Sequence, residues 1–245
     1  MVSNRYKMAG KVVEINSLYD EVHTYCADYQ TDETPDYFVT TTQGDIDSER
    51  EKSAREDEIE GVPVRHFFDS YLEELAVYRK IAEQMIVFDT ILFHGSVIAV
   101  DGIGYLFTAK SGTGKSTHTK LWRDYFGDRA VMVNDDKPLI HVGTNGVTVY
   151  GTPYNGKHRR GNNIAVPLKA ICILTRAEEN HIEPITVKQA YPLLVQQVYR
   201  TPDSVKMMKT LTLIDTLTEQ VRFYRLGCNM ELSAAKIAFE GMYHG

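Results

Sequence analysis

A run of small residues between an apolar strand and an amphipathic helix is the feature that most constrains this chain. Residues 105–108 have the composition of a buried strand, and Leu121, Trp122 and Phe126 recur further on at helical spacing. Between them lies the string Ala109-Lys-Ser-Gly-Thr-Gly-Lys-Ser-Thr117. The order strand, glycine-rich loop and helix is typical of a phosphate-binding loop (P-loop), so we expect an α/β fold around it.

In a P-loop, successive backbone N–H groups point at the phosphates of a nucleotide, and the following helix adds its positive N-terminal end. Lys115 would reach the β- and γ-phosphates, and the Ser116 hydroxyl would ligate Mg²⁺. The alternative is a turn rich in glycine and serine that matches by chance. The residues predicted to bind the nucleotide are Ser111, Gly112, Thr113, Gly114, Lys115, Ser116 and Thr117.

The first position of the loop departs from the usual pattern. A P-loop has glycine there, and this chain has Ala109. A methyl group is tolerated where the backbone φ angle is negative, and it is strained where φ is positive. We therefore predict a negative φ at Ala109.

Composition excludes several classes of protein. The 245 residues, 43% of them hydrophobic, suffice for one large α/β domain, or for one domain with a small appendage. The net charge of −6, with no basic patch, argues against nucleic acid as a partner. No apolar run is long enough to span a bilayer, so we expect a cytoplasmic protein without a membrane partner. Cys26, Cys172 and Cys228 are scattered, which favours reduced thiols.

Two parts are predicted along the chain. Residues 1–61 form a small N-terminal α/β subdomain, and residues 62–245 form the P-loop domain around a mixed sheet. Residues 45–60 hold eight acids and three bases and are interpreted as a solvated helix or loop. Residues 71–88 have the pattern of an amphipathic helix, and Ser70 with Glu73 matches a capping box at its start.

The strand that feeds the P-loop is predicted to form an antiparallel hairpin with the strand before it in sequence. Residues 91–100 are mostly apolar, and Asp101-Gly-Ile-Gly104 has the chemistry of a tight turn. His94 lies on this first strand. A histidine in an apolar strand is often a hydrogen-bonded core residue, and the alternative is an imidazole that contacts a reacting carboxylate or phosphoryl group.

A second cluster of polar residues follows the next buried strand. Asn134, Asp135 and Asp136 come directly after the apolar residues 130–133. An acid at the end of a strand beside a P-loop is where Mg²⁺ is held, and a second carboxylate can accept a proton from an attacking hydroxyl. Because adjacent strand residues point to opposite sides, the two acids converge only if the chain bends there. The alternative is a simple Asp-Asp turn.

A basic loop offers positive charge for phosphoryl transfer. Residues 155–163 contain Lys157, His158, Arg159 and Arg160 between glycines. Cations around a γ-phosphate offset the charge that develops during transfer. A solvated basic loop is the other reading, and we expect Arg159 or Arg160 to act at the site.

Taken in order, these motifs resemble the catalytic core of the HPr kinase/phosphorylase family. The resemblance covers residues 88–176: a His-Gly strand, a hairpin, the P-loop and an Asp-Asp pair. It implies the mixed-sheet P-loop kinase core that this family shares with phosphoenolpyruvate carboxykinases. It also implies that Asp135 is the base on the substrate hydroxyl, that His94 partners this aspartate, and that Asp136 binds the metal with Ser116.

One departure concerns the loop after these strands. The family reads Glu-Ile-Arg-Gly there, whereas this chain reads His158-Arg-Arg-Gly161, so Arg160 and Gly161 match and the acid is missing. The basic loop by which HPr kinases engage their protein substrate is not evident either. The chain also resembles small bacterial proteins labelled as phosphoenolpyruvate carboxykinases, and related kinases phosphorylate serine on ribosomally made peptides.

The sequence therefore predicts ATP- and Mg²⁺-dependent transfer of a phosphoryl group to a hydroxyl of a protein, a peptide or a small metabolite. GTP or pyrophosphate could replace ATP, and a homo-oligomer is possible in this family. Two alternatives stay open. One is a carboxykinase-like reaction on a small acid, and the other is a nucleotide-binding regulator that has lost catalysis.

Overall fold

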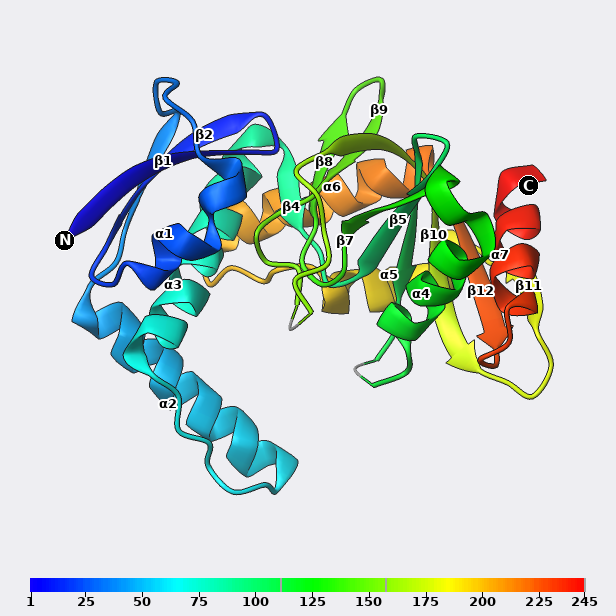
Figure 1. Ribbon diagram of the computed structural model, residues 1–245, viewed down its shortest axis with the longest axis horizontal. Coiled ribbons are helices and arrows are strands. Elements are labelled where there is room, and N and C mark those ends of the chain that lie inside the picture. Colours follow the sequence, from blue (N-terminus) through cyan, green and yellow to red (C-terminus); the bar gives the residue numbers. More distant parts are fainter. Residues whose placement is uncertain (111, 157, 245) are drawn as a thin grey trace. The chain divides into compact units, whose positions relative to one another are not determined.

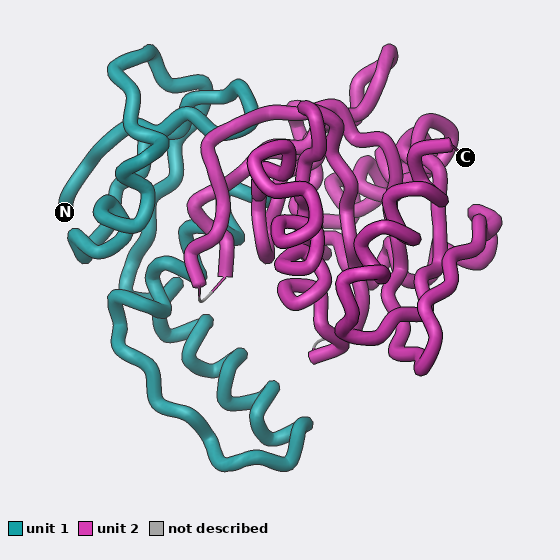
Figure 2. The backbone as a smooth tube through the Cα atoms, turned by 45° about the vertical axis from the view of Figure 1, so that its right-hand side comes forward, with its two compact units in different colours: residues 1–84 teal, residues 85–245 magenta. Residues whose placement is uncertain are grey.

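The computed structural model describes residues 1–110, 112–156 and 158–244. The chain divides into two compact units, Met1–Gln84 and Met85–Gly245 (Figure 2). Both units combine helices with a sheet, so the chain is an α/β protein (Figure 1). None of the helices in the described ranges is long and apolar enough to cross a membrane.

The first unit is built on a three-stranded sheet in the order β1-β2-β3. β1 and β2 form an antiparallel hairpin, and β3 returns parallel to β2. The sheet strands are β1 (Val2–Met8), β2 (Lys11–Ser17) and β3 (Tyr37–Thr40), and the helices are α1 (Glu21–Tyr25), the short 3-10 helix η1 (Ala27–Tyr29), α2 (Gln43–Glu60) and α3 (Asp69–Met85).

The acidic segment, residues 45–60, forms most of α2 and is therefore a helix. Thr42 and Asp45 make a capping box at its start, and Gly61 ends it in the left-handed conformation with φ of 69°. Arg50 bonds Asp47 one turn away and also Asp69 at the start of α3. The helix therefore carries both signs of charge and belongs to the packed unit.

The first compact unit extends to Gln84 and so includes α3, and Glu73 contributes to this packing. The fully buried Glu73 carboxylate in α3 accepts hydrogen bonds from the backbone N–H groups of Leu18 (2.7 Å) and Tyr19 (2.8 Å), and from the Thr41 hydroxyl. The expected capping box with Ser70 is wrong, since α3 already begins at Asp69. Glu73 instead joins α3 to the loop after β2.

Replacing Glu73 by glutamine is expected to destabilise the protein by about 1–3 kcal/mol, because the amide keeps one acceptor oxygen and turns an N–H₂ group toward buried donors. Urea unfolding would measure the loss. The matched control is Glu58→Gln in α2, where the side chain is exposed and little change is expected. Equal effects of the two substitutions would contradict the structural role of Glu73.

The second unit contains one mixed sheet, in which the described residues form nine strands. The main path runs β4-β8-β9-β10-β6-β5-β7, and β12 pairs with β10 and β11 beside it. The strands are β4 (Thr90–Leu92), β5 (Ser96–Val100), β6 (Ile103–Thr108), β7 (Ala130–Asn134), β8 (Leu139–Gly143), β9 (Gly146–Tyr150), β10 (Ala165–Arg176), β11 (His181–Pro184) and β12 (Arg222–Cys228).

The predicted hairpin before the P-loop is confirmed, but the strand predicted over residues 91–100 divides into β4 and β5, and His94 lies between them. β5 and β6 pair antiparallel, with Ser96 opposite Phe107 and Val100 opposite Ile103. The other neighbour of β6 is the long strand β10, which runs parallel to it. The strand that feeds the P-loop is thus paired on both sides and buried in the middle of the sheet.

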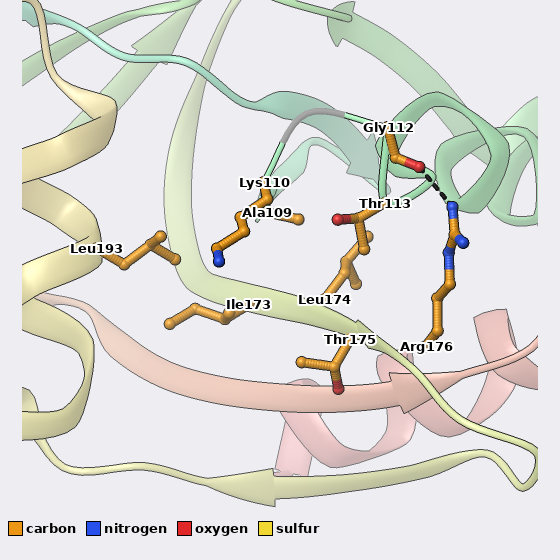
Figure 3. Close-up of a pocket in the computed structure, with 9 residues that line it drawn as sticks. All are labelled: Ala109, Lys110, Gly112, Thr113, Ile173, Leu174, Thr175, Arg176 and Leu193. Atoms are coloured by element: carbon orange, nitrogen blue, oxygen red, sulfur yellow. Dashed lines mark hydrogen bonds between the residues drawn. The ribbon is translucent and has the colours of Figure 1, made fainter. Parts of the chain in front are cut away.

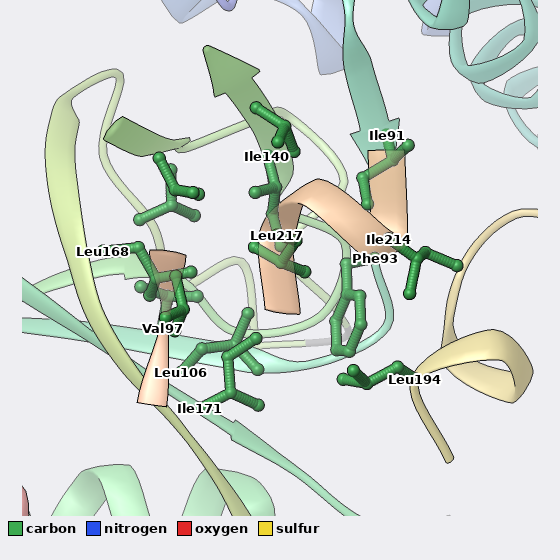
Figure 4. Close-up of a cluster of buried hydrophobic side chains, with 14 of the residues drawn as sticks. Ile91, Phe93, Val97, Leu106, Ile140, Leu168, Ile171, Leu194, Ile214 and Leu217 are labelled. Carbon is green, nitrogen blue, oxygen red and sulfur yellow. The ribbon is translucent and has the colours of Figure 1, made fainter. Parts of the chain in front are cut away.

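Helices cover both faces of this sheet. α5 (Val187–Gln197) and α6 (Ser204–Gln220) pack with sheet residues into one apolar cluster, part of which is drawn in Figure 4. α4 (Lys115–Phe126) and α7 (Ser233–His244) share a second cluster on the other face. The short 3-10 helices η2 (Ile86–Phe88) and η3 (Gly127–Arg129) precede β4 and β7. Burial of both faces explains the nearly continuous apolar runs of the central strands.

The strand directions collect the polar motifs at one edge of the sheet. β6, β10 and β12 are parallel, and β7 has the same direction because β5 is antiparallel to both β6 and β7. The carboxyl ends of these four strands therefore meet at the edge where β5 begins. In open α/β sheets, ligands bind outside the carboxyl ends of the strands.

Candidate functional site

The loop after β6 leads into α4 through two glycines with left-handed backbone conformations. Gly112 and Gly114 adopt positive φ angles of 75° and 120°, and Ala109 is not among the non-glycine residues with positive φ, so that prediction is confirmed. The Thr113 N–H donates to the Lys110 carbonyl (3.2 Å), and α4 begins at Lys115. Ser116 and Thr117 lie in the first helical turn. Ser111 lies outside the described residues.

The side chain of Arg176 holds this loop from the end of β10. Its Nη2 donates to the Gly112 carbonyl oxygen at 2.7 Å (Figure 3). Arg176 was not predicted from the sequence, although it ends the apolar strand β10 that runs parallel to β6. A cavity of about 540 Å³ lies beside it, between the loop, the end of β10 and Leu193 of α5. Lys110 extends into this region (Figure 3).

Aromatic packing fixes the helix that carries Lys115. Trp122 is fully buried, and its ring lies against Phe107 and Tyr105 of β6. Its indole Nε1 donates to His118 Nε2 at 3.0 Å. Burial lowers the pKa of His118 to about 4, so the imidazole is neutral and able to accept this bond. The first turn of α4 is therefore held rigidly beside the loop.

The Asp135 carboxylate accepts a hydrogen bond from β5, the strand that pairs with β7. The Ser96 hydroxyl, at the start of β5, donates to Asp135 Oδ1 at 2.9 Å and also approaches the Asp135 carbonyl oxygen at 3.1 Å. Only 7% of Asp135 is exposed. Ser96 was not singled out from the sequence, and its position beside His94 and Gly95 is the signal that could have found it.

Asn134 makes the bend that the two acids require. Its side-chain oxygen accepts the backbone N–H groups of Asp136 (2.9 Å) and Lys137 (2.7 Å). Its amide nitrogen donates to the carbonyl and the hydroxyl of Thr152. Asn134 is fully buried, so the turn after β7 is locked by a satisfied polar group. This local turn brings both carboxylates to the same edge.

Unlike Asp135, whose carboxylate accepts from a serine hydroxyl, Asp136 lies beside a lysine and a histidine. Its Oδ1 lies 3.0 Å from Lys137 Nζ and 3.3 Å from His94 Nε2. The resemblance implied that His94 would partner Asp135, and the structure differs because Asp135 turns to Ser96 and leaves Asp136 facing the imidazole. Lys137 was also missed, although a basic residue directly after two acids is a visible signal.

The site groups are close enough to affect one another's charge. Burial lowers the pKa of Lys115, with Lys137 adding to the effect, and the carboxylates of Asp136 and Asp135 oppose it. Burial, followed by Lys137 and Lys115, lowers the pKa of His94 to about 4. His94 is therefore neutral near pH 7 and forms no ion pair with Asp136. Lys115 and the two acids are therefore near enough to influence one another electrostatically.

The basic loop is bound against the end of β7. A Cβ on Gly151 would lie 1.9 Å from the Asn162 carbonyl oxygen, so only glycine allows the two ends of the loop to meet. A Cβ on Gly156, where φ is 76°, would lie 3.3 Å from the Asp136 side chain. Arg159 and Arg160 are exposed in this loop, and the next residue bridges to Asn134. The loop thus lies beside Asp136.

The donor set fits a particular kind of metal site. No group of three or more His, Cys, Asp or Glu residues that could hold a metal occurs in the described ranges. Mg²⁺ does not need such a cage, because it keeps several waters and binds through one or two carboxylates together with substrate phosphates. Asp136 and the Ser116 hydroxyl suit that mode, and they do not suit a structural zinc or calcium site.

Fold and site define an α/β protein with a P-loop-like strand, loop and helix beside paired carboxylates. The chain belongs to the family described as SynChlorMet cassette protein ScmC, whose model matches residues 71–222. A search of curated proteins found no match. Among solved structures, the HPr(Ser) kinase/phosphatase from Coxiella burnetii is similar at 13% identity and a TM-score of 0.33, over 62% of this chain and 97% of that one.

Proposed function

We propose that the protein is an ATP- and Mg²⁺-dependent kinase that transfers the γ-phosphoryl group to a hydroxyl, with a core of the HPr kinase type. The observation that carries the proposal is the placement of Lys115 at the start of α4, after β6, and of Asp135 and Asp136 after β7, at the same carboxyl edge of the sheet. Phosphoryl transfer requires a phosphate cradle, positive charge and a carboxylate in one place. The order of strands, which puts the ends of β6 and β7 at one edge, supports this proposal.

Each residue has a defined role in the proposed reaction. The loop N–H groups and Lys115 would bind the triphosphate, and Asp136 with Ser116 would hold a hydrated metal ion. Mg²⁺ offsets the negative charge that builds up on the phosphates. Asp135, oriented by Ser96, accepts the proton of the acceptor hydroxyl as its oxygen bonds to the γ-phosphorus and the bond to the β-phosphate oxygen breaks, which releases ADP.

Three further groups surround the transferring phosphoryl. His94 Nε2 lies 3.3 Å from Asp136 Oδ1, so the imidazole borders this carboxylate. Lys137 Nζ lies 3.0 Å from the same Asp136 oxygen and adds positive charge beside this carboxylate. Arg159 or Arg160, in the loop beside Asp136, offsets charge on the γ-phosphate. The acceptor is a serine of a protein or peptide, or a small metabolite with a hydroxyl.

A label-transfer experiment tests the proposal. The protein is incubated with γ-labelled ATP, Mg²⁺ and a cell extract, in parallel with Asp135→Asn and with a sample containing EDTA. Label should pass to a protein, peptide or metabolite only with the unmodified protein and Mg²⁺. Tight ATP binding without transfer would overturn the kinase assignment in favour of a regulator, for which His158 in place of the family's glutamate is the specific observation. Phosphorylation and decarboxylation of oxaloacetate would favour the carboxykinase.

A further inference from the structure

The backbone around His94 is held from three directions. His94 lies in the short link between β4 and β5, and its N–H donates to the Gln197 carbonyl oxygen at 2.7 Å. The His94 carbonyl oxygen accepts the Thr108 hydroxyl at 3.1 Å. The next residue, Gly95, donates its N–H to the Asp136 carbonyl oxygen at 3.0 Å. These bonds tie the link to the end of α5, to β6 and to the turn after β7.

Gln197 itself starts from a well-anchored backbone. It is the last residue of α5, and the residue after it, Val198, forms a β-bridge with Phe93. Phe93 is fully buried and belongs to the same apolar cluster as Leu194, which lies about one turn earlier in α5 (Figure 4). The Gln197 side chain therefore leaves a fixed point of the backbone beside His94.

The side-chain amide of Gln197 has a buried oxygen. Among the described residues, none meets Gln197 Oε1 at ordinary hydrogen-bond geometry, although the atom is shielded from water. A buried acceptor in that state is unfavourable, so its position needs a reason. The pKa of His94 indicates where the oxygen acts. Burial lowers this pKa, and the Gln197 side chain opposes the lowering, as an acceptor beside a ring N–H does.

The other side of the imidazole faces charged groups. Nε2 lies 3.3 Å from Asp136 Oδ1, and Lys137 Nζ donates to the same oxygen at 3.0 Å. A neutral imidazole carries one N–H and one lone pair. After burial, Lys137 is the next cause that lowers the pKa of His94, so its charge favours a lone pair at Nε2. Asp136 acts in the opposite sense, but its Oδ1 already accepts from Lys137.

We propose that Gln197 is a positioning residue for His94: its Oε1 accepts the N–H of Nδ1 and leaves a lone pair on Nε2, beside Asp136 and Lys137. A small rotation of the ring or of the amide completes this bond. The inference rests on the proposed function, in which Asp136 belongs to the transfer site, and it extends that site to the end of α5. Gln197 keeps the ring from turning over, and the ring leaves the pair of Lys137 and Asp136 undisturbed.

The variant Gln197→Met keeps the length of the side chain and removes the acceptor oxygen. The imidazole can then turn over or carry its proton on Nε2, where the N–H would compete with Lys137 for Asp136 Oδ1. The rate of phosphoryl transfer should fall about five- to tenfold, the effect of one hydrogen bond. ATP affinity should stay within about twofold. The matched control is Gln196→Met, which changes the exposed neighbouring glutamine and should alter neither quantity.

The position of the proton on His94 is the decisive measurement, and it needs no transfer activity. Nuclear magnetic resonance of protein with ¹⁵N-labelled histidine distinguishes a protonated ring nitrogen from an unprotonated one. The signals of His94 are those that disappear in His94→Asn. Near pH 7, the unmodified protein should show a protonated Nδ1 and an unprotonated Nε2, and Gln197→Met should shift toward the opposite form. Gln196→Met should keep the pattern of the unmodified protein.

His118 serves as an internal reference for these spectra. Its Nε2 accepts the indole N–H of Trp122 at 3.0 Å, so its proton must lie on Nδ1. It should therefore show the pattern expected of His94, and it should show it in every variant.

The outcomes separate this inference from the proposed function. If His94 carries its proton on Nε2 in the unmodified protein, or if Gln197→Met leaves its pattern unchanged, the role of Gln197 is overturned whatever the transfer rate. Equal losses of rate in Gln197→Met and Gln196→Met would overturn it as well. If the unmodified protein transfers no phosphoryl group, the kinase proposal falls, and the spectra still decide whether Gln197 fixes the proton of His94.

Discussion

Replacing Asp135 by asparagine is expected to lower the rate of phosphoryl transfer about 10²- to 10⁴-fold, the usual contribution of a general base, while ATP binding changes little. The amide keeps an oxygen that can accept the Ser96 hydroxyl bond, so the turn after β7 should survive. What is lost is the ability to take a proton. Single-turnover transfer and calorimetric ATP binding would measure the two quantities separately.

Asp136→Asn is the matched variant, because it changes the neighbouring acid in the same way. It should raise the Mg²⁺ concentration needed for half-maximal transfer, and excess Mg²⁺ should restore part of the rate. Asp135→Asn should not respond to added Mg²⁺. The contact between His94 and Asp136 makes the opposite assignment a clear alternative outcome. If Asp136→Asn were dead at all Mg²⁺ concentrations and Asp135→Asn were rescued, the two roles would be reversed.

Local chemistry allowed part of the site to be predicted. The glycines and Lys115 of the P-loop, the turn at residues 101–104 and the two acids after β7 all lie in short strings whose backbone preferences are readable without the fold. The φ angle of Ala109 followed from the same reasoning, because a Cβ restricts the backbone wherever it occurs. These features depend on neighbours in sequence.

The groups that the sequence did not reveal depend on strand order. Arg176 reaches Gly112 only because β10 runs parallel to β6, and Ser96 reaches Asp135 only because β5 lies between β6 and β7. Glu73, in the first unit, also has partners that the local sequence does not reveal. Its spacing from Ser70 matched a local capping pattern, but its carboxylate binds backbone groups that are distant in sequence. Long-range pairing overrode the local signal.

Nucleotide affinity itself is expected to depend on Lys115. Lys115→Met should weaken ATP binding about 10- to 100-fold, since a hydrogen bond to a charged phosphate contributes about 1.5–3 kcal/mol. The transfer rate should fall further, by about 10²- to 10³-fold, because the lysine also offsets charge that develops in the transition state. Calorimetry and the label-transfer assay measure the two effects.

The Lys115→Met variant should lose ATP affinity without losing thermal stability. Burial lowers the pKa of Lys115, which means that the folded protein holds the ammonium group at a cost in the absence of a phosphate. An uncharged methionine of similar length removes that cost, so the melting temperature of Lys115→Met should stay equal or rise. The control is Lys120→Met on the same helix, where the side chain is exposed and pairs with Asp124. It should bind ATP normally, and a similar loss of affinity in both variants would show that Lys115 acts only through general charge and not as the phosphate-binding residue of the loop.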